Sequence, residues 1–316
     1  MGCWSISTKD FFWDNQARAD SLHAIQSSLD TGVNFFDTAP GYGNGDSEEI
    51  LGEALAGRRA QCILTTKVPP THLEPEKLRT SCEASLRALR SDYIDLYQVH
   101  WPNPSVPWQD TWGELVRLKH EGKIRAVGVS NFGISYLEQL PPFGRVETNQ
   151  VPYSLLWRAV EYEILPWCQA HAMGLLCYSP LAQGLLTGKF RTPQEVPDKR
   201  ARSRLFPASR AMTRHGEAGC QEAAFASIEA LRTIAAELGQ PINRLAMAWL
   251  LHQPGVTAVV AGARNAQQAA DNAQAADVQL EAAVLQRLAA ATQTVKAHIG
   301  PNADPWEHVS RMERAG

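Results

Sequence analysis

The feature that most constrains the fold of this chain is a regular alternation of two residue patterns. Segments with the apolar spacing of amphipathic helices alternate with short apolar or β-branched runs, which is typical of βα units around a parallel sheet. The predicted strands are 2–6, 33–37, 62–68, 94–100, 125–130, 146–150, 175–179 and 256–261. The predicted helices that alternate with them are 18–30, 47–56, 75–89, 108–120, 134–140, 160–171, 223–238 and 266–275.

Eight strands alternating with eight helices favour an α/β fold of the (β/α)8 TIM-barrel class. A doubly wound open sheet stays the alternative, because alternation alone does not show whether a sheet closes. Two features interrupt the alternation of strands and helices. They are a long loop over 190–219 after the seventh strand, and extra C-terminal helices over 241–252 and 280–298. No linker divides the chain, so we predict a single domain over residues 1–316.

Composition excludes several classes of partner. The formal charge of -3 leaves no basic surplus for a phosphate backbone, so nucleic acid is not an expected partner. The sequence has neither a secretory signal nor an apolar run that could cross a bilayer, which predicts no membrane partner and a cytoplasmic location. The six cysteines are scattered without CxxC, and the nine histidines include no HExxH, so no metal is expected.

Four polar residues stand where predicted strands run out into loops: Asp37, Tyr42, Lys67 and His100. In a βα-barrel this edge carries the active site. Each residue also has a plainer reading, namely a turn cap, a surface turn, a solvated strand-end charge and a core histidine. Four groups of complementary chemistry from three successive strands nevertheless favour a catalytic cluster.

The chemistry that these four residues would support is hydride transfer to a carbonyl group. Such a transfer leaves charge on the carbonyl oxygen and needs a proton donor at hydrogen-bond distance. A tyrosine has a pKa near 10, and we expect a neighbouring lysine ammonium to lower it. An aspartate would keep that lysine charged, and the histidine could bond to the same carbonyl oxygen.

The chain resembles the aldo-keto reductase family. The strings that carry the resemblance are NFFDTAPGYG, TTKV, DYIDLYQVHWP, GKIRAVGVSNF, ETNQVPYSLL, YSPLAQGLLTGKF and VVAGARNAQQAADN. The resemblance implies an NADP(H)-dependent oxidoreductase that reduces aldehydes or ketones, with Asp37, Tyr42, Lys67 and His100 as the catalytic tetrad and Tyr42 as general acid-base. Bacterial glyceraldehyde 3-phosphate reductases and potassium-channel β subunits are similar, so an NADP(H)-binding regulatory subunit is the alternative function.

The resemblance also implies which residues bind the cofactor. Ser130, Asn131 and Gln150 match the positions that hold the nicotinamide carboxamide, and Tyr178 matches the aromatic residue under the ring. The pyrophosphate loop corresponds to Ser179, Leu181, Gly184, Leu186 and Lys189. The site of the 2'-phosphate and adenine corresponds to Gly262, Arg264, Gln268 and Asn272, and Arg264 predicts a preference for NADPH over NADH.

The small-molecule carbonyl substrate itself does not follow from the sequence, and neither does the oligomeric state. Trp4, Trp101 and Trp157 are candidate substrate contacts, although each of them could instead be a packing residue. Family members begin with a hairpin that closes the barrel floor, whereas this sequence reaches its first strand at once. We therefore expect a version extended upstream with such a hairpin to be more stable.

Overall fold

The computed structural model describes residues 1–13 and 15–313 of the chain. Its backbone contacts divide it into two compact units. Among the described residues, the first comprises Met1–Gln150, Val260–Ala273 and Glu313, and the second comprises Val151–Val259 and Gln274–Met312. A single domain over residues 1–316 remains a prediction.

Seven strands occur within the described residues, and they are hydrogen-bonded in chain order. The pairs of neighbours from β1 to β5 are parallel, as in Phe36 opposite Leu64 and Val99 opposite Val129. Apolar side chains such as these are buried, which the parallel sheets of βα proteins require. The strands are β1 (Phe35–Asp37), β2 (Ile63–Val68), β3 (Ile94–Val99), β4 (Ile124–Ser130), β5 (Thr148–Pro152), β6 (Gly174–Tyr178) and β7 (Val256–Val260).

The predicted first strand over 2–6 is wrong except at one residue. Gly2 makes parallel bridges to both Asp37 and Gly262, so one residue joins the end of β1 to the segment after β7 within the first unit. The chain then turns into the 3-10 helix η1 (Trp4–Ile6). Hydroxyl groups explain the turn, because Ser47 donates to the Cys3 carbonyl at 2.6 Å and Ser21 donates to the Ile6 carbonyl at 2.6 Å, in place of strand partners.

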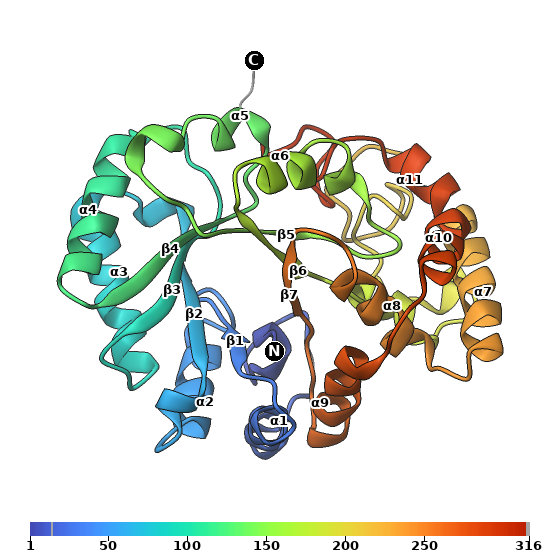
Figure 1. Cartoon of the computed structure of the whole chain (residues 1–316), viewed down its shortest axis with the longest axis horizontal. Coiled ribbons are helices and arrows are strands. Elements are labelled where there is room, and N and C mark those ends of the chain that lie inside the picture. The colour runs from blue at the N-terminus through green and yellow to red at the C-terminus, as the bar shows by residue number, and fades with distance from the viewer. Residues whose placement is uncertain (14, 314–316) are drawn as a thin grey trace. The chain divides into compact units, whose positions relative to one another are not determined.

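In the first unit a helix follows almost every strand. Figure 1 shows α2, α3 and α4 on the outer side of β2, β3 and β4. Buried apolar residues, for instance Leu51, Leu78 and Leu115, join these helices to the sheet. The helices of this unit are α1 (Arg18–Asp30), α2 (Asp46–Ala54), α3 (Pro75–Ala88), α4 (Trp108–His120), α5 (Ile134–Leu137) and α9 (Ala266–Ala273), with 3-10 turns η2 (Arg59–Gln61), η3 (Pro70–His72) and η4 (Pro141–Phe143).

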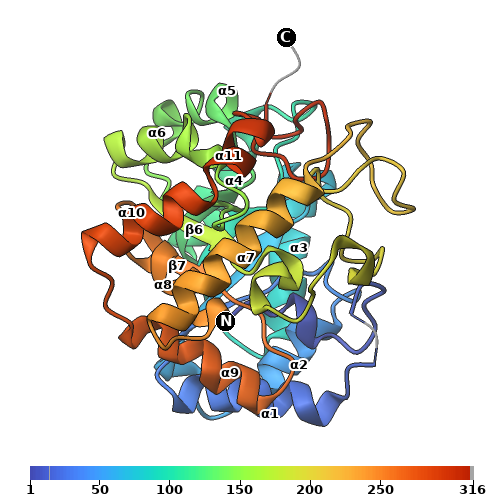
Figure 2. The same ribbon diagram turned by 90° about the vertical axis from the view of Figure 1, so that its right-hand side faces the viewer.

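In the second unit α7 packs against α8, α10 and α11, an arrangement that Figure 2 shows. The long 190–219 loop is tied down by Arg204, which is 6% exposed and pairs with Glu217 at 2.9 Å. The elements are α6 (Ile164–Ala170), α7 (Gln221–Glu237), α8 (Ile242–Leu251), α10 (Ala282–Ala291) and α11 (Gln293–Ile299), with η5 (Ala159–Glu161), η6 (Ala182–Thr187), η7 (Pro193–Glu195) and η8 (Gln274–Asp277). No helix in the described residues is long and apolar enough to span a membrane.

Three predicted helices are longer than the observed ones. The helix over 160–171 begins only at Ile164, because Pro166 has no N–H and fits only the first turn. The helix over 134–140 ends at Leu137, shortly before two prolines, and the helix over 280–298 is interrupted at Thr292. The Thr292 side chain is buried and lies 3.3 Å from the Arg158 guanidinium.

Candidate active site

A buried ion pair stands at the centre of the first unit. The Lys67 amino group lies 2.8 Å from Asp37 Oδ1 and 2.8 Å from Oδ2, and it also donates to the Thr38 carbonyl at 2.9 Å. The lysine side chain is 0% exposed and the aspartate side chain 3%. Two charges without water are stable only when each neutralises the other, so the pair fixes both side chains in place.

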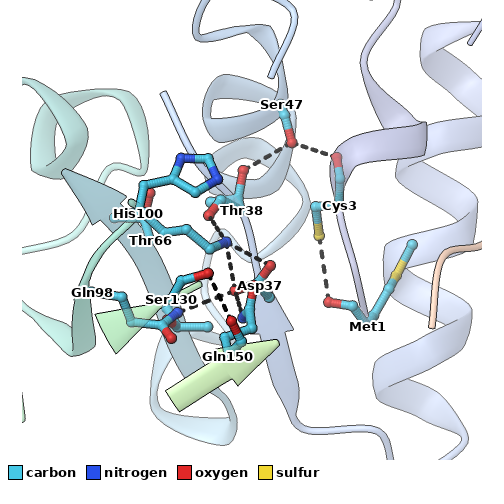
Figure 3. Close-up of polar contacts among 12 residues, drawn as sticks. Met1, Cys3, Asp37, Thr38, Ser47, Thr66, Gln98, His100, Ser130 and Gln150 are labelled. Carbon is cyan, nitrogen blue, oxygen red and sulfur yellow. Dashed lines mark hydrogen bonds and ion pairs between the residues drawn. The ribbon is translucent and has the colours of Figure 1, made fainter. Parts of the chain in front are cut away.

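Two amide side chains complete the surroundings of the carboxylate (Figure 3). Gln150 Nε2 donates to Asp37 Oδ1 at 2.7 Å, and Gln98 Nε2 lies 3.4 Å from the same oxygen and 2.9 Å from Thr65 Oγ1. Sequence reasoning missed Gln98. A glutamine inside the otherwise apolar strand LYQV was the available signal, because a buried amide needs polar partners.

Tyr42 comes to this pair from the turn after β1. Gly43 has φ +58°, and a Cβ there would lie 1.7 Å from Ser7 Oγ, so the turn requires glycine. The Lys67 amino group lies 5.3 Å from the centroid of the Tyr42 ring, and the His100 ring meets the tyrosine ring edge-on with centroids 6.0 Å apart. The four residues predicted as a tetrad therefore lie together in one unit.

The electrostatics of Tyr42 differ from the expectation. Burial, followed by the charge of Asp37, raises the pKa of Tyr42 well above its usual value, so the prediction that Lys67 lowers this pKa is wrong for the protein alone. The reason is that desolvation penalises the phenolate and the negative charge of Asp37 repels it. The phenol keeps its proton.

The pKa of His100 shifts in the direction that leaves its imidazole uncharged. Burial first, and the Lys67 charge second, lower the pKa of His100 to about 3. A neutral imidazole at physiological pH can still donate one hydrogen bond, and a carbonyl oxygen can accept it.

Three predicted carboxamide-binding residues form one cluster beside Asp37. Ser130 Oγ donates to the Gln150 carbonyl at 3.0 Å, and Asn131 Nδ2 lies 3.0 Å from Ser130 Oγ and from the His100 carbonyl. Asn131 has φ +61°, a conformation that asparagine tolerates better than most residues. The cluster offers amide and hydroxyl groups at the carboxyl ends of β4 and β5.

The predicted pyrophosphate loop lies in the second unit, where it follows Tyr178 at the end of β6. Ser179 has φ +53°, and residues 182–184 also have positive φ. The N–H groups of Gly184 and Leu186 both donate to the Leu181 carbonyl, at 2.9 and 3.1 Å. A Cβ on Gly184 would lie 3.2 Å from the Lys189 amino group, so the lysine folds back over the loop.

Arg232, which sequence reasoning missed, holds this loop from α7. Its Nη2 donates to the Gly188 carbonyl at 2.8 Å and to the Phe190 carbonyl at 2.7 Å. The side chain is 14% exposed. Nothing in the local sequence distinguishes this arginine from the others of an amphipathic helix.

The four residues predicted to bind the 2'-phosphate and adenine lie just before α9 and along it in the first unit. Arg264 N donates to Gln268 Oε1 at 3.0 Å, and Asn272 Nδ2 donates to the Gly262 carbonyl at 3.0 Å. The Arg264 guanidinium donates through Nε to Gln16 Oε1 at 2.8 Å. Gln16, which was not predicted, therefore orients the arginine.

The three candidate tryptophans have different surroundings. Trp4 stacks on Tyr42 with ring centroids 5.9 Å apart, and Trp101 directly follows His100 and is half-buried. Trp157, in the second unit, is 4% exposed and donates its indole N–H to the Ala303 carbonyl at 3.1 Å. Its surroundings are those of a packing residue, and a substrate role for each of the three stays a prediction.

Comparisons with known proteins all indicate the same family. The model of the "Aldo/keto reductase family" matches residues 1–293. Aldo-keto reductase YhdN of Bacillus subtilis is 35% identical over 85% of this chain and 81% of its own length. The NADH-specific methylglyoxal reductase of Escherichia coli is 31% identical over 86% of this chain and 87% of its own.

A solved structure agrees with these sequence relatives. The aldo/keto reductase from Klebsiella pneumoniae, in complex with NADP and acetate, superposes with a TM-score of 0.73 at 29% identity, over 95% of this chain and 90% of its own. Together with the chain-ordered parallel strands, this likeness confirms the predicted (β/α)8 fold class.

Proposed function

This chain belongs to the aldo/keto reductase family, and we propose that it reduces aldehydes or ketones to alcohols with NADP(H) as its cofactor. The observation that carries the proposal is the position of Lys67, which is paired with Asp37 and lies 5.3 Å from the Tyr42 ring centroid. A buried ammonium beside a phenol is suited to a reaction in which the phenol gives up its proton.

The proton steps follow from the protein groups. Bound NADPH supplies a hydride to the carbonyl carbon. The Tyr42 hydroxyl, whose pKa burial holds high, gives its proton to the carbonyl oxygen as negative charge develops there. Lys67 then stabilises the phenolate, Asp37 keeps the lysine charged, and solvent returns the proton. The neutral His100 ring donates a hydrogen bond to the same oxygen and orients the substrate.

The residues suit the two ends of an NADP(H) molecule. The hydroxyl and amide groups of Ser130, Asn131 and Gln150 match the donors and acceptors of a carboxamide. Arg264, at the start of α9, suits a phosphate because it adds a guanidinium to the positive end of a helix dipole. The Klebsiella relative in complex with NADP supports this cofactor.

Turnover of a carbonyl panel by the full chain tests this function. NADPH oxidation is followed with methylglyoxal, benzaldehyde, acetophenone and a sugar phosphate, with reaction mixtures lacking the carbonyl as the control. We expect turnover of at least one aldehyde. Tight NADPH binding without turnover of any carbonyl would contradict the proposal and favour the regulatory-subunit alternative.

A further inference from the structure

An aromatic surface adjoins the Tyr42 phenol in the first unit. The Trp4 ring stacks on Tyr42 with an interplanar angle of 28°. The rings of Phe12 and Trp13 each meet Trp4 edge-on, with centroids 5.7 Å apart. Flat apolar surfaces of this kind bind aromatic molecules by stacking and by burial of apolar area. The proton donor therefore lies at the edge of an aromatic surface.

One carboxylate holds this surface together. Asp10 Oδ2 accepts the indole N–H of Trp4 at 2.7 Å, and Asp10 Oδ1 accepts the backbone N–H of Phe12 at 2.8 Å. Both bonds come from uncharged donors, so neither cancels the negative charge. Asp10 has no ion-pair partner in the part of the chain that the structure describes, and the amino group of the adjacent Lys9 pairs with Asp46 at 3.8 Å.

The buried ion pair next to the phenol adds no net charge. Lys67 and Asp37 form a pair with no net charge. Asp10 is a charge near Tyr42 that no ion pair within the described residues of the first unit compensates. Its field reaches the phenol, because Asp10 adds to the effects of burial, Asp37 and Cys3 that raise the pKa of Tyr42. A substrate bound against Trp4 would experience the same field.

We propose that Asp10 determines substrate charge preference, so that the site selects uncharged or cationic aromatic aldehydes over aldehydes that carry a carboxylate. This inference rests on the proposed reductase function. Repulsion between two like charges about 4 Å apart amounts to about fivefold in relative rate even at the dielectric constant of water, and it is larger near a protein surface. High salt screens such an effect.

The test compares benzaldehyde with two para-substituted derivatives, the 4-carboxylate and the 4-trimethylammonium. kcat/KM is measured for each with the full chain, Asp10→Asn, Asp10→Glu and the control Asp20→Asn. Asp20 lies exposed on α1, so its substitution changes the net charge of the protein equally. Ratios to benzaldehyde are compared between variants, because the intrinsic reactivity of each aldehyde then cancels.

We expect Asp10→Asn to raise the carboxylate ratio about five- to tenfold and to lower the cation ratio. Asp10→Glu and Asp20→Asn should keep the ratios of the full chain. Ratios in Asp10→Asn that equal those of the full chain would overturn the proposal, even if kcat/KM falls equally for all three substrates, because Asp10 would then be a purely structural cap. Absence of turnover of every carbonyl in the panel would instead overturn the reductase function itself, whereas turnover of methylglyoxal without any turnover of benzaldehyde would overturn the aromatic preference alone.

Discussion

The Lys67 ammonium lies 2.8 Å from each carboxylate oxygen of Asp37, in surroundings from which water is excluded. Loss of one partner of such a pair leaves an uncompensated buried charge. We therefore expect Lys67→Met to lower the free energy of unfolding by about 3–5 kcal/mol and to abolish turnover. Urea unfolding and steady-state kinetics measure the two effects.

The double variant Asp37→Asn/Lys67→Met is the matched control for this prediction. It removes both charges, so most of the stability should return, whereas turnover should not. A single lysine variant as stable and as active as the unmodified chain would contradict the role given to the pair.

The lowered pKa of His100 predicts how the stability of the folded chain depends on pH. Its pKa is about 3 in the folded chain, against 6.5 for an ordinary histidine. As the pH falls below about 6.5, the unfolded chain binds a proton that the folded chain refuses. Folding should therefore weaken progressively toward about pH 3, and this group should contribute nothing above about pH 7.

Melting temperatures measured from about pH 4 to 8 check this expectation. His100→Gln should show a shallower loss of stability on the acid side than the unmodified chain. Parallel curves for the two proteins would mean that His100 titrates normally.

The cofactor preference depends on Arg264, which Gln16 orients through a 2.8 Å hydrogen bond to Nε. A charge-assisted bond from this guanidinium to a 2'-phosphate contributes about 1.5–3 kcal/mol, or about ten- to a hundredfold in affinity. We expect tighter binding of NADPH than of NADH, and a selective loss for NADPH in Arg264→Ala. Fluorescence titration with both cofactors measures this. If Arg264→Ala weakened the binding of both cofactors equally, the assignment of Arg264 to the 2'-phosphate site would be contradicted.

Most of the strand order and the four polar strand-end residues could be predicted from the sequence. Their signals are local: an apolar run fixes each strand, and Asp37 or Lys67 directly ends or interrupts one. Predicted boundaries failed where a distant group decided the conformation. The hydroxyls of Ser21 and Ser47 take the carbonyls that a first strand would have used, and no local pattern shows that.

The supporting residues of the site could not be predicted for the same reason. Gln98, Gln16 and Arg232 act through contacts with segments far away in the sequence. The sign of the Tyr42 pKa shift also depended on burial, which the sequence does not give. Asp10 is a polar residue beside two aromatic ones, and only the structure connects it to Trp4.

Arg232 gives a prediction about the loop over 179–189. Without its bonds to the Gly188 and Phe190 carbonyls, the loop should lose its fixed conformation. We expect Arg232→Ala to raise KM for NADPH about tenfold, since two charge-assisted bonds are lost, with a much smaller change of kcat. Arg232→Lys, which keeps one donor, should restore part of the affinity. A fall of kcat at unchanged KM would contradict this positioning role.

The most direct test of the account is the kinetics of Tyr42→Phe. This change deletes only the hydroxyl, so the aromatic contacts with Trp4 and His100 can persist. Turnover of an aldehyde that the unmodified chain reduces is measured beside NADPH binding by fluorescence titration. We predict a fall of about a hundredfold or more in kcat with nearly unchanged NADPH affinity, because only the proton donor is lost. Activity within a few-fold of the unmodified chain would contradict the assignment of Tyr42 as the acid.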